Sequence, residues 1–451
     1  MSEALTILLP EKVRYIIHRI TQAGYEAYAV GGCVRDSVLG RKPDDWDITT
    51  SASPRQIKGL FERTLDTGLK HGTVTVMLGQ EGFEVTTYRI DGDYEDGRHP
   101  KEVTFTASLL EDLKRRDFTV NAMAYNDQDG LVDAFDGIKD LRAGIIRCVG
   151  SPGERFSEDA LRILRAIRFS AQLGYRIEPQ TQKAIEELAP NLRVISAERI
   201  QAELIKLVAS PHPENLGIAY RRGVTKIILP EFDSCMETAQ NNPHHCYSVG
   251  EHILKSMQEI APDKLLRLAM LFHDIGKPGT RTTDEKGIHH FHGHPALSAE
   301  IAHDVLRRLK FDNHTISMVT KLVKYHDQKV LPEPVYVRRA ILQIGEDTFP
   351  LLYDVKLADL KAQSSFRRRE KEESLEEIYR IYRQIMSEGQ CVCLKTLAVS
   401  GQDLIDEAGM KPGRELGRTL QRLLDMVIEN PSLNTRETLL KIVMNCTPEF
   451  K

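Results

Sequence analysis

The apolar residues of the first 150 positions fall into short runs that are bounded by Gly, Asp and Pro. Four such runs, rich in β-branched or aromatic residues, read YEAYAV, WDITTS, GTVTVML and FEVTTYR, and they are predicted to be strands. The stretch LPEKVRYIIHRITQAG is predicted to be a helix, because Pro10 lies near its start and Gly24 just past its end. This part of the chain is therefore predicted to be α+β.

From about Ser157 onward the apolar positions recur with the 3.6-residue period of a helix. The stretches SEDALRILRAIRFSAQLG, SAERIQAELIKLVAS and PDKLLRLAMLFHDIG all show it. No repeat of fixed length marks a solenoid. The predicted fold class is α+β, with an N-terminal mixed sheet and helices followed by an all-helical remainder.

Composition indicates an ordinary soluble protein of several domains. The 451 residues are 41% hydrophobic and 28% charged, with a net charge of -4, so a nucleic-acid surface would have to be a local patch. The N-terminus lacks the features of a signal peptide, and no run of apolar residues is long enough to span a membrane. Seven cysteines, an odd number and mostly scattered, favour free thiols in a reducing cytoplasm.

The stretch VGGCVRDSVLGRKPDDWDIT combines adjacent glycines, Gly31 and Gly32, with an Asp-Trp-Asp triplet. If the triplet opens a strand, Asp45 and Asp47 project from one face while Trp46 anchors the other face in the core. Two like charges at that spacing repel each other, and a divalent cation would neutralise them. Magnesium suits such a site because it takes oxygen ligands and bridges to substrate phosphates.

The glycines predict close approach of the backbone to a triphosphate, with the N–H groups of the following helix facing the anion. Arg35 lies on that helix. The alternative is a surface loop with scattered acids, which the combination of Gly-Gly, strand context and Trp46 disfavours. Glu84, in FEVTTYR, is a candidate third carboxylate, and a plain half-exposed strand acid is the equal alternative for it.

These features resemble the nucleotidyltransferase superfamily, and more closely the class II tRNA CCA-adding enzymes and their bacterial poly(A) polymerase relatives. Four further motifs of that family follow in family order, so that the resemblance covers residues 25–210. They read RRDFTVNAMAYN, DAFDGIKDLRAGIIRCVG, EDALRILRAIRF and SAERIQAELIKL.

The resemblance implies a polymerase β-like head that adds C, C and A to the 3′ end of tRNA from CTP and ATP, without a template and with release of pyrophosphate. Mg²⁺ held by Asp45 and Asp47 would serve the transfer. Arg116 and Asp117 would contact the nucleotide sugar and phosphate, and Asn121 would support the pocket. The implied partners are therefore tRNA, CTP and ATP, and no association with a membrane is expected.

The fourth motif predicts a protein template for base choice. On one helix, Asp159, Arg162 and Arg165 would share a face, and Arg168 belongs to the same predicted nucleotide-binding set. A carboxylate accepts from an exocyclic amino group while a guanidinium donates to a ring nitrogen. An Asp159–Arg162 pair would therefore select cytosine and adenine, the bases that the family adds. The alternative is an ordinary surface ion pair within the helix.

The segment YRIDGDYEDGRHPKEVTF is predicted to be a mobile loop. By the resemblance, its presence with Asp96, Arg98 and Pro100 disfavours an enzyme that adds only CC. An A-adding enzyme or poly(A) polymerase remains an alternative, although the chain lacks the strongly basic C-terminal tail usual in the latter. A second alternative is a non-catalytic RNA-binding protein, against which the intact Asp-x-Asp argues.

Twelve of the fifteen histidines lie between His212 and His326. His273 and Asp274 end an apolar helix, which suggests metal coordination. The order of His and Asp residues resembles the HD phosphohydrolase superfamily. That resemblance implies a core site and a second metal site, made respectively by His252, His273, Asp274 and Asp359 and by His294 and His326.

Such a site would take a divalent transition metal or magnesium and could hydrolyse phosphomonoesters or cyclic 2′,3′-phosphates at RNA ends. The alternative is a degenerate HD fold whose histidines only pack and hydrogen-bond. The implied organisation is a nucleotidyltransferase head over residues 1–150, a helical neck for base selection and RNA binding over 151–240, an HD-like domain over 241–370, and a tRNA-binding helical tail over 371–451. Nothing in the sequence indicates the oligomeric state.

Overall fold

The computed structural model describes residues 6–69, 72–91 and 103–445. It divides the chain into two compact units, Met1–Asp233 and Ser234–Lys451, which are described separately. The predicted loop with Asp96, Arg98 and Pro100 lies outside the described residues. The finer division into four segments stays a prediction.

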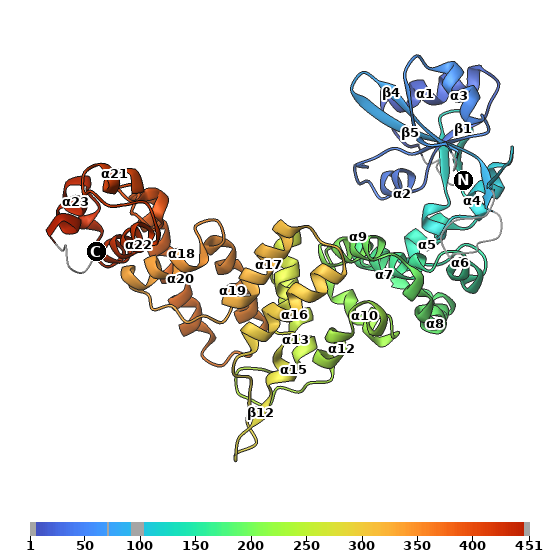
Figure 1. Ribbon diagram of the computed structural model, residues 1–451. Coiled ribbons are helices and arrows are strands. Elements are labelled where there is room, and N and C mark those ends of the chain that lie inside the picture. Colours follow the sequence, from blue (N-terminus) through green and yellow to red (C-terminus); the bar gives the residue numbers. More distant parts are fainter. Residues whose placement is uncertain (1–5, 70–71, 92–102, 446–451) are drawn as a thin grey trace. The chain divides into compact units, whose positions relative to one another are not determined.

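The first unit opens with a seven-stranded mixed sheet in the order β3-β4-β5-β2-β1-β8-β9. Its strands β1, β4 and β5 are labelled in the blue part of the ribbon in Figure 1. Strand β1 is antiparallel to both of its neighbours, whereas β2 and β5 are parallel. A separate ribbon pairs β6 with β7. The strands are β1 (Ala27–Val30), β2 (Ile48–Thr50), β3 (Thr64–Gly68), β4 (Thr73–Leu78), β5 (Glu81–Thr87), β6 (Arg89–Asp91), β7 (Val103–Phe105), β8 (Ala124–Asn126) and β9 (Gly130–Val132).

Helices α1 (Glu11–Gln22) and α3 (Pro54–Leu60) pack against this sheet. The predicted first helix is thus present, and its 3.6-residue period buries Val13, Ile16 and Ile20. Two shorter helices, α2 (Gly32–Val38) and α4 (Leu109–Lys114), carry residues that are discussed with the site below.

The predicted strand WDITT is shorter than expected, because β2 begins only at Ile48. Asp45 and Asp47 lie in the irregular segment before it, and Trp46 is half-buried instead of anchoring the core. The three residues of β2 are all buried, with Ile48 only 1% exposed. The β-branched side chains therefore fill the core under the sheet, and the indole is left at its margin.

The rest of the first unit is helical, with one short parallel pair, β10 (Ile145–Ile146) and β11 (Arg176–Ile177). The helix predicted from Ser157 is interrupted, because α6 ends at Glu158 and α7 begins at Leu161. Helices α7 and α9 pack together. The helices are α5 (Gly137–Ala143), α6 (Pro152–Glu158), α7 (Leu161–Leu173), α8 (Pro179–Leu188), α9 (Ala197–Val208), α10 (Leu216–Arg221), α11 (Thr225–Ile228) and α12 (Pro230–Met236).

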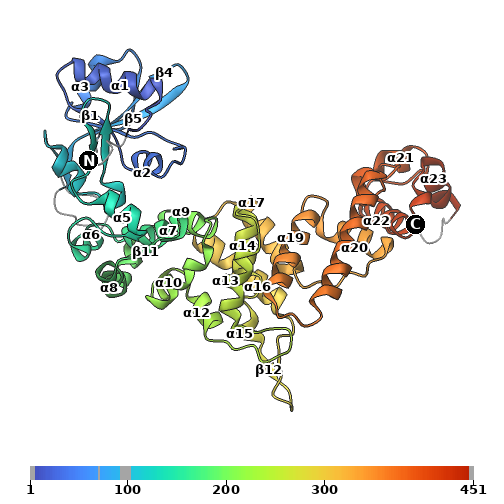
Figure 2. The ribbon, with the colours of Figure 1, turned by 180° about the vertical axis from the view of Figure 1, so that it is seen from behind.

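The second unit is almost entirely helical, and α13, α14, α16, α17 and α19 lie side by side in it (Figures 1 and 2). A small hairpin joins β12 (Thr282–Thr283) to β13 (His289–His290). No helix in the described part of the chain is both long and apolar enough to cross a membrane. The helices are α13 (Val249–Gln258), α14 (Lys264–Phe272), α15 (Lys277–Thr280), α16 (His294–Arg308), α17 (Asn313–Tyr325), α18 (Pro334–Ile344), α19 (Phe349–Ala362), α20 (Arg368–Ser387), α21 (Gly401–Asp406), α22 (Arg414–Glu429) and α23 (Arg436–Asn445).

Candidate functional site

A cleft of about 470 Å³ opens in the first unit and is lined mainly by arginines. Seven arginines and three aspartates line it, which suits an anionic ligand such as a nucleoside triphosphate. The lining residues are Gly31, Gly32, Arg35, Asp47, Arg115, Arg116, Asp117, Asn121, Asp159, Leu161, Arg162, Arg165, Arg168, Phe169 and Arg199.

Three carboxylates gather at one side of this cleft, although Asp45 and Glu84 lie outside the set of lining residues. Ile48 of β2 pairs with Val85 of β5, so Asp47 and Glu84 precede paired positions on parallel strands. Partial burial raises the pKa of Glu84, and so do the charges of Asp47 and Asp45. Surrounding protein atoms also raise the pKa of Asp47, with Asp45 adding to the shift and Arg116 opposing it. Such mutual repulsion among exposed acids is what a divalent cation relieves.

Gly31 has a backbone conformation that only glycine adopts easily, with φ 82° and ψ -128°. Its N–H donates to the carbonyl of Met123, and α2 starts at the next residue. A Cβ atom at this position would lie 3.2 Å from Nη1 of Arg116. The paired glycines therefore allow an arginine of the second motif to lie directly over the backbone turn.

The second motif forms a hydrogen-bonded network with α2 and α7. Asp117 accepts from Arg165 Nε at 2.7 Å and from Asn121 Nδ2 at 3.2 Å. Asn121 Oδ1 in turn accepts from Arg35 Nη1 at 2.7 Å. Burial opposes ionisation of Asp117, but the guanidiniums of Arg165 and Arg162 lower its pKa to about 2. The side chain is therefore a carboxylate at neutral pH, and the network holds these groups in place before a ligand binds.

Asp159 is not on a helix face as predicted, because it lies in the break between α6 and α7 with extended backbone angles. Its Oδ1 accepts from the backbone N–H of Leu161 at 3.0 Å, and its Oδ2 accepts from Arg199 Nη2 at 2.7 Å. The carboxylate still lines the cleft. Its position is set by the start of α7 and by an arginine of α9, and not by helical spacing to Arg162.

Arg162, the other predicted base-reading residue, is held by Glu158 and by a backbone carbonyl. Its Nη1 donates to Glu158 Oε2 at 2.5 Å, and its Nη2 donates to the carbonyl oxygen of Arg115 at 3.1 Å. The alternative of an ion pair between Asp159 and Arg162 within one helix is therefore wrong, because Asp159 pairs with Arg199 and Arg162 pairs with Glu158. Both members of the predicted pair nevertheless face the same cleft.

Sequence reasoning missed several residues that support this cleft. Arg199 and Glu203 both lie in the fifth family motif, SAERIQAELIKL, for which the sequence predicted no individual site residue. Glu203 is buried and its Oε2 lies 2.7 Å from Arg168 Nε, so that Arg168 is anchored at the wall. The guanidinium of Arg168 lies 3.9 Å from the ring centroid of Phe169. Arg199 and Glu203 pair with Asp159 and Arg168 of the fourth motif and not with each other, so no spacing within the fifth motif could have revealed them.

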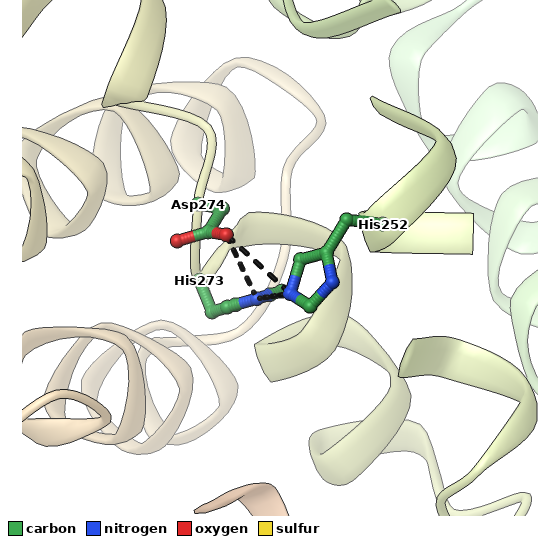
Figure 3. Close-up of side chains that lie close together, drawn as sticks. All are labelled: His252, His273 and Asp274. Atoms are coloured by element: carbon green, nitrogen blue, oxygen red, sulfur yellow. Dashed lines mark hydrogen bonds and ion pairs between the residues drawn. The ribbon is translucent and has the colours of Figure 1, made fainter. Parts of the chain in front are cut away.

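A second cluster of functional side chains lies in the second unit (Figure 3). His273 Nε2 lies 3.3 Å from His252 Nε2 and 3.3 Å from Asp274 Oδ2. Asp359, on α19, brings its Oδ1 within 2.8 Å of His252 Nε2. The four residues predicted as the core site therefore converge, and the side chains of His252, His273 and Asp274 are almost completely buried.

The two remaining predicted ligands form an adjoining group around the same aspartate. His294 Nε2 lies 3.2 Å from His326 Nε2 and 3.3 Å from Asp274 Oδ1. Two sets of potential ligand atoms within 4.8 Å of one another result, and Asp274 belongs to both.

The orientation of three of these histidines follows from the helix ends on which they lie. His273 and His326 are the C-cap residues of α14 and α17, where carbonyl groups lack helical partners. Nδ1 of His273 lies 2.7 Å from the carbonyl of Met270, and Nδ1 of His326 and of His294 make equivalent contacts at 2.7 and 2.8 Å. A carbonyl can only accept, so each Nδ1 carries the proton and each Nε2 points into the cluster.

The Nε2 atoms without protons and the carboxylate oxygens of the cluster are all acceptors that face one another. A positive charge among them is therefore required. A proton can supply it, because Asp274 and Asp359 overcome the effect of burial and raise the pKa of His273 to about 10. Both carboxyl pKa values are held well below their usual range despite burial. A divalent metal supplies the same charge, and the outward-anchored histidines are typical of metal ligands.

Two cavities give access to this buried cluster. One of about 730 Å³ is lined by Asp274, Lys277, His294 and Lys371, among others. The other, of about 670 Å³, has an apolar wall with Tyr353, and both cavities reach His326 and Asp359. A small anionic molecule can therefore approach the histidines, with Lys277 Nζ already 2.7 Å from Asp274 Oδ2.

Three family models match successive parts of the chain. Residues 27–147 match the "Poly A polymerase head domain", and residues 174–236 match the "Probable RNA and SrmB- binding site of polymerase A". Residues 281–443 match "tRNA nucleotidyltransferase domain 2".

Curated relatives extend the match to nearly the whole chain. The CCA-adding enzyme of Limosilactobacillus reuteri is 34% identical over 443 residues, which cover 97% of both chains. That of Lacticaseibacillus paracasei is 36% identical over 430 residues, covering 95% of this chain and 94% of the relative. The chain belongs to the CCA-adding enzyme family.

Solved structures agree with this membership. The CCA-adding enzyme of Bacillus stearothermophilus, crystallised in complex with CTP, is 28% identical with a TM-score of 0.72, over 98% of this chain and 99% of that one. The Thermotoga maritima CCA-adding enzyme complexed with tRNA shares the fold, with a TM-score of 0.57 at 20% identity, over 97% of this chain and 96% of that one. The predicted α+β fold and nucleotidyltransferase class are confirmed, and members of this family use divalent metal ions.

Proposed function

We propose that the chain adds C, C and A to the 3′ end of tRNA from CTP and ATP, with release of pyrophosphate. The observation that carries the proposal is the arginine-rich cleft, which Asp47, Asp159 and Arg162 all line. Relatives of nearly full length are CCA-adding enzymes, and the Bacillus stearothermophilus structure holds CTP. The six cysteines in the described part of the chain are all free, which supports the cytoplasm as the proposed location.

The arrangement of residues suits attack of the tRNA 3′ hydroxyl on the α-phosphate of the nucleotide. Asp45 and Asp47, with Glu84 beside them, would hold Mg²⁺, which supplies activation of the hydroxyl and stabilisation of the leaving oxygens. The cleft arginines neutralise and orient the triphosphate, and Arg116 lies over Gly31 where the phosphates would approach. Asp117 stays ionised and can accept from a ribose hydroxyl.

Base choice would come from Asp159 and Arg162. The carboxylate accepts from the exocyclic amino group of cytosine or adenine, and the guanidinium donates to the neighbouring ring nitrogen. Uracil and guanine present the opposite order of donor and acceptor. A hydrogen bond from Arg199 holds Asp159 at the cleft wall, so base reading needs no large movement of that carboxylate.

The experiment is nucleotide incorporation with Mg²⁺ on tRNA transcripts that end before CCA, after C, or after CC. Each transcript is offered CTP, ATP or both, beside the variants Asp45→Ala and Asp47→Ala. Addition of C, C and A to the first transcript, stopping there and lost in the variants, supports the proposal. A single A added only after CC would identify an A-adding enzyme, long A tracts a poly(A) polymerase, and tRNA binding without incorporation a non-catalytic RNA-binding protein.

A second activity is favoured by the histidine cluster of the second unit. We infer that His252, His273, Asp274 and Asp359 hold one divalent metal, and that Asp274, His294 and His326 can hold another. Three Nδ1 groups fixed on carbonyls, with their Nε2 atoms converging, support this inference. A bound metal would supply a hydroxide nucleophile for hydrolysis of phosphomonoesters or cyclic 2′,3′-phosphates, and Lys277 and Lys371 would attract the anionic substrate.

The test of this second activity uses the full chain loaded in turn with Ni²⁺, Mn²⁺ or Mg²⁺. Release of phosphate from nucleoside monophosphates and opening of a cyclic 2′,3′-phosphate are measured, beside His273→Ala and Asp45→Ala. Hydrolysis lost in His273→Ala and kept in Asp45→Ala supports a separate hydrolytic site. Metal binding without hydrolysis would instead indicate a structural metal, and absence of binding would leave a degenerate HD-like fold.

A further inference from the structure

One carboxylate of the first unit is fully buried and does not itself line the cleft, although it contacts two arginines that do. Asp112, on α4, is 0% exposed. Its Oδ1 accepts from Arg115 Nε at 3.0 Å and Nη2 at 2.7 Å, which forms a two-bond pair with the planar guanidinium. This pair neutralises the buried charge, and together with Arg116 it lowers the pKa of Asp112 in spite of burial.

The other oxygen of Asp112 joins two elements of the nucleotide-transfer site. Oδ2 accepts from Thr49 Oγ1 at 3.2 Å and from Arg116 Nη2 at 3.2 Å. Thr49 is fully buried in β2, two residues after Asp47. One carboxylate oxygen therefore connects the strand that follows the metal-binding acids with an arginine that lines the cleft.

Arg116 depends on this contact for its orientation. Its Nη1 lies over Gly31, and its Nε is buried without a protein hydrogen-bond partner. Its charge also reaches Asp47, where it opposes the rise in pKa that burial causes. A flexible side chain with one hydrogen bond to a fixed carboxylate loses much of its freedom, which reduces the ordering cost when a phosphate binds.

We propose that Asp112 is a positioning residue that sets Arg116 for the triphosphate and ties it to the metal-binding strand through Thr49. The proposal rests on the proposed nucleotide transfer in this cleft. Asp112 acts through Arg116, because it is buried and cannot touch the nucleotide itself. A purely structural ion pair would stabilise the fold without setting how the triphosphate binds.

The first test is Asp112→Asn, which keeps the size of the side chain and removes its charge. We expect KM for CTP and for ATP to rise about tenfold, with kcat changed less than about threefold, because a charge-assisted bond that orients a binding group is lost. Asp233→Asn is the matched control, since Asp233 is a buried carboxylate that accepts from Thr225 in the same unit. It should cost stability and leave both KM values unchanged.

The second test asks whether Asp112 acts through Arg116. Arg116→Gln should raise KM more than Asp112→Asn, and the double variant should match Arg116→Gln within about twofold, because linked residues are not additive. Additive effects would overturn the proposal. So would a KM for Asp112→Asn no higher than that of Asp233→Asn.

Thr49→Val covers the case in which Asp112→Asn does not fold, because it leaves every charge in place. It removes one hydrogen bond to Oδ2, and we expect about a threefold rise in KM. Unchanged KM at reduced melting temperature would overturn the positioning role. Failure of the wild-type chain to incorporate any nucleotide would instead overturn the proposed function, so the two failures are distinguishable.

Discussion

Gly31→Ala tests directly why two glycines open the nucleotide cleft. The backbone at this position has φ 82° and ψ -128°, which an L side chain rarely adopts, and the strain amounts to about 1–3 kcal/mol. The added Cβ would also stand 3.2 Å from Arg116 Nη1. This separation is tighter than ordinary van der Waals contact, so Arg116 must shift by a few tenths of an ångström.

Gly130→Ala is the matched control for the backbone term. Gly130 also has a positive φ, 75°, and a Cβ built there meets no atom within 4 Å. Both variants should therefore lose about 1–3 kcal/mol of unfolding free energy. Only Gly31→Ala should also raise KM for CTP and ATP, by roughly tenfold, which corresponds to about 1.4 kcal/mol of lost binding.

The assay is steady-state incorporation on a tRNA transcript lacking CCA, paired with urea unfolding of both variants. The stability loss measured for Gly130→Ala is taken as the cost of positive φ alone. If Gly31→Ala loses the same stability and keeps the wild-type KM, the close approach of Arg116 to the backbone has no role in nucleotide binding. The explanation given for the Gly-Gly pair would then be wrong.

Four further outcomes are expected. Asp47→Asn should reduce nucleotide addition by about a thousandfold or more with an unchanged melting temperature, because the residue is exposed and its loss relieves repulsion; a large fall in melting temperature would contradict this. Arg199→Ala should raise misincorporation of UTP about fivefold in competition assays, because Asp159 loses its anchoring charge-assisted bond. Asp117 has its folded pKa lowered to about 2 from 3.8, so it contributes stability above pH 4 that is lost as the pH falls toward 2; wild type should lose about 2 kcal/mol more than Asp117→Asn between pH 5 and pH 2 in urea unfolding. Chelation of a metal-loaded sample should lower the melting temperature of wild type by several degrees and leave Asp274→Ala, which lacks the aspartate shared by both ligand sets, unaffected, as calorimetry would show.

The helices and strands were largely predictable from the sequence because their signals are local. The period of apolar residues in α1 and α7 and the β-branched runs of β4 and β5 reflect burial of one face or of a whole strand. Local patterns were less reliable at element ends. The break at Asp159 arises where its side chain accepts from the N–H of Leu161 at the start of α7, and no apolar periodicity records that competition.

The chemical character of both sites could likewise be predicted from residue types and motif order. Gly-Gly with Asp-x-Asp indicated a nucleotide and metal site, and the histidine-rich region indicated metal ligands. The prediction that Trp46 is buried in the core was wrong. The neighbouring strands decide which side chain fills the core beneath β2, and local sequence does not show them.

The order of elements and the set of groups available for chemistry follow from local patterns in the chain. Which of those groups meet depends on tertiary packing. Asp159 pairs with Arg199 across 40 residues, Thr49 with Asp112 across 63, and His252 meets Asp359 across 107. Pairing at such separations depends on how helices and strands pack, and the energy of a buried charge pair depends on ångström-scale geometry that periodicity does not contain.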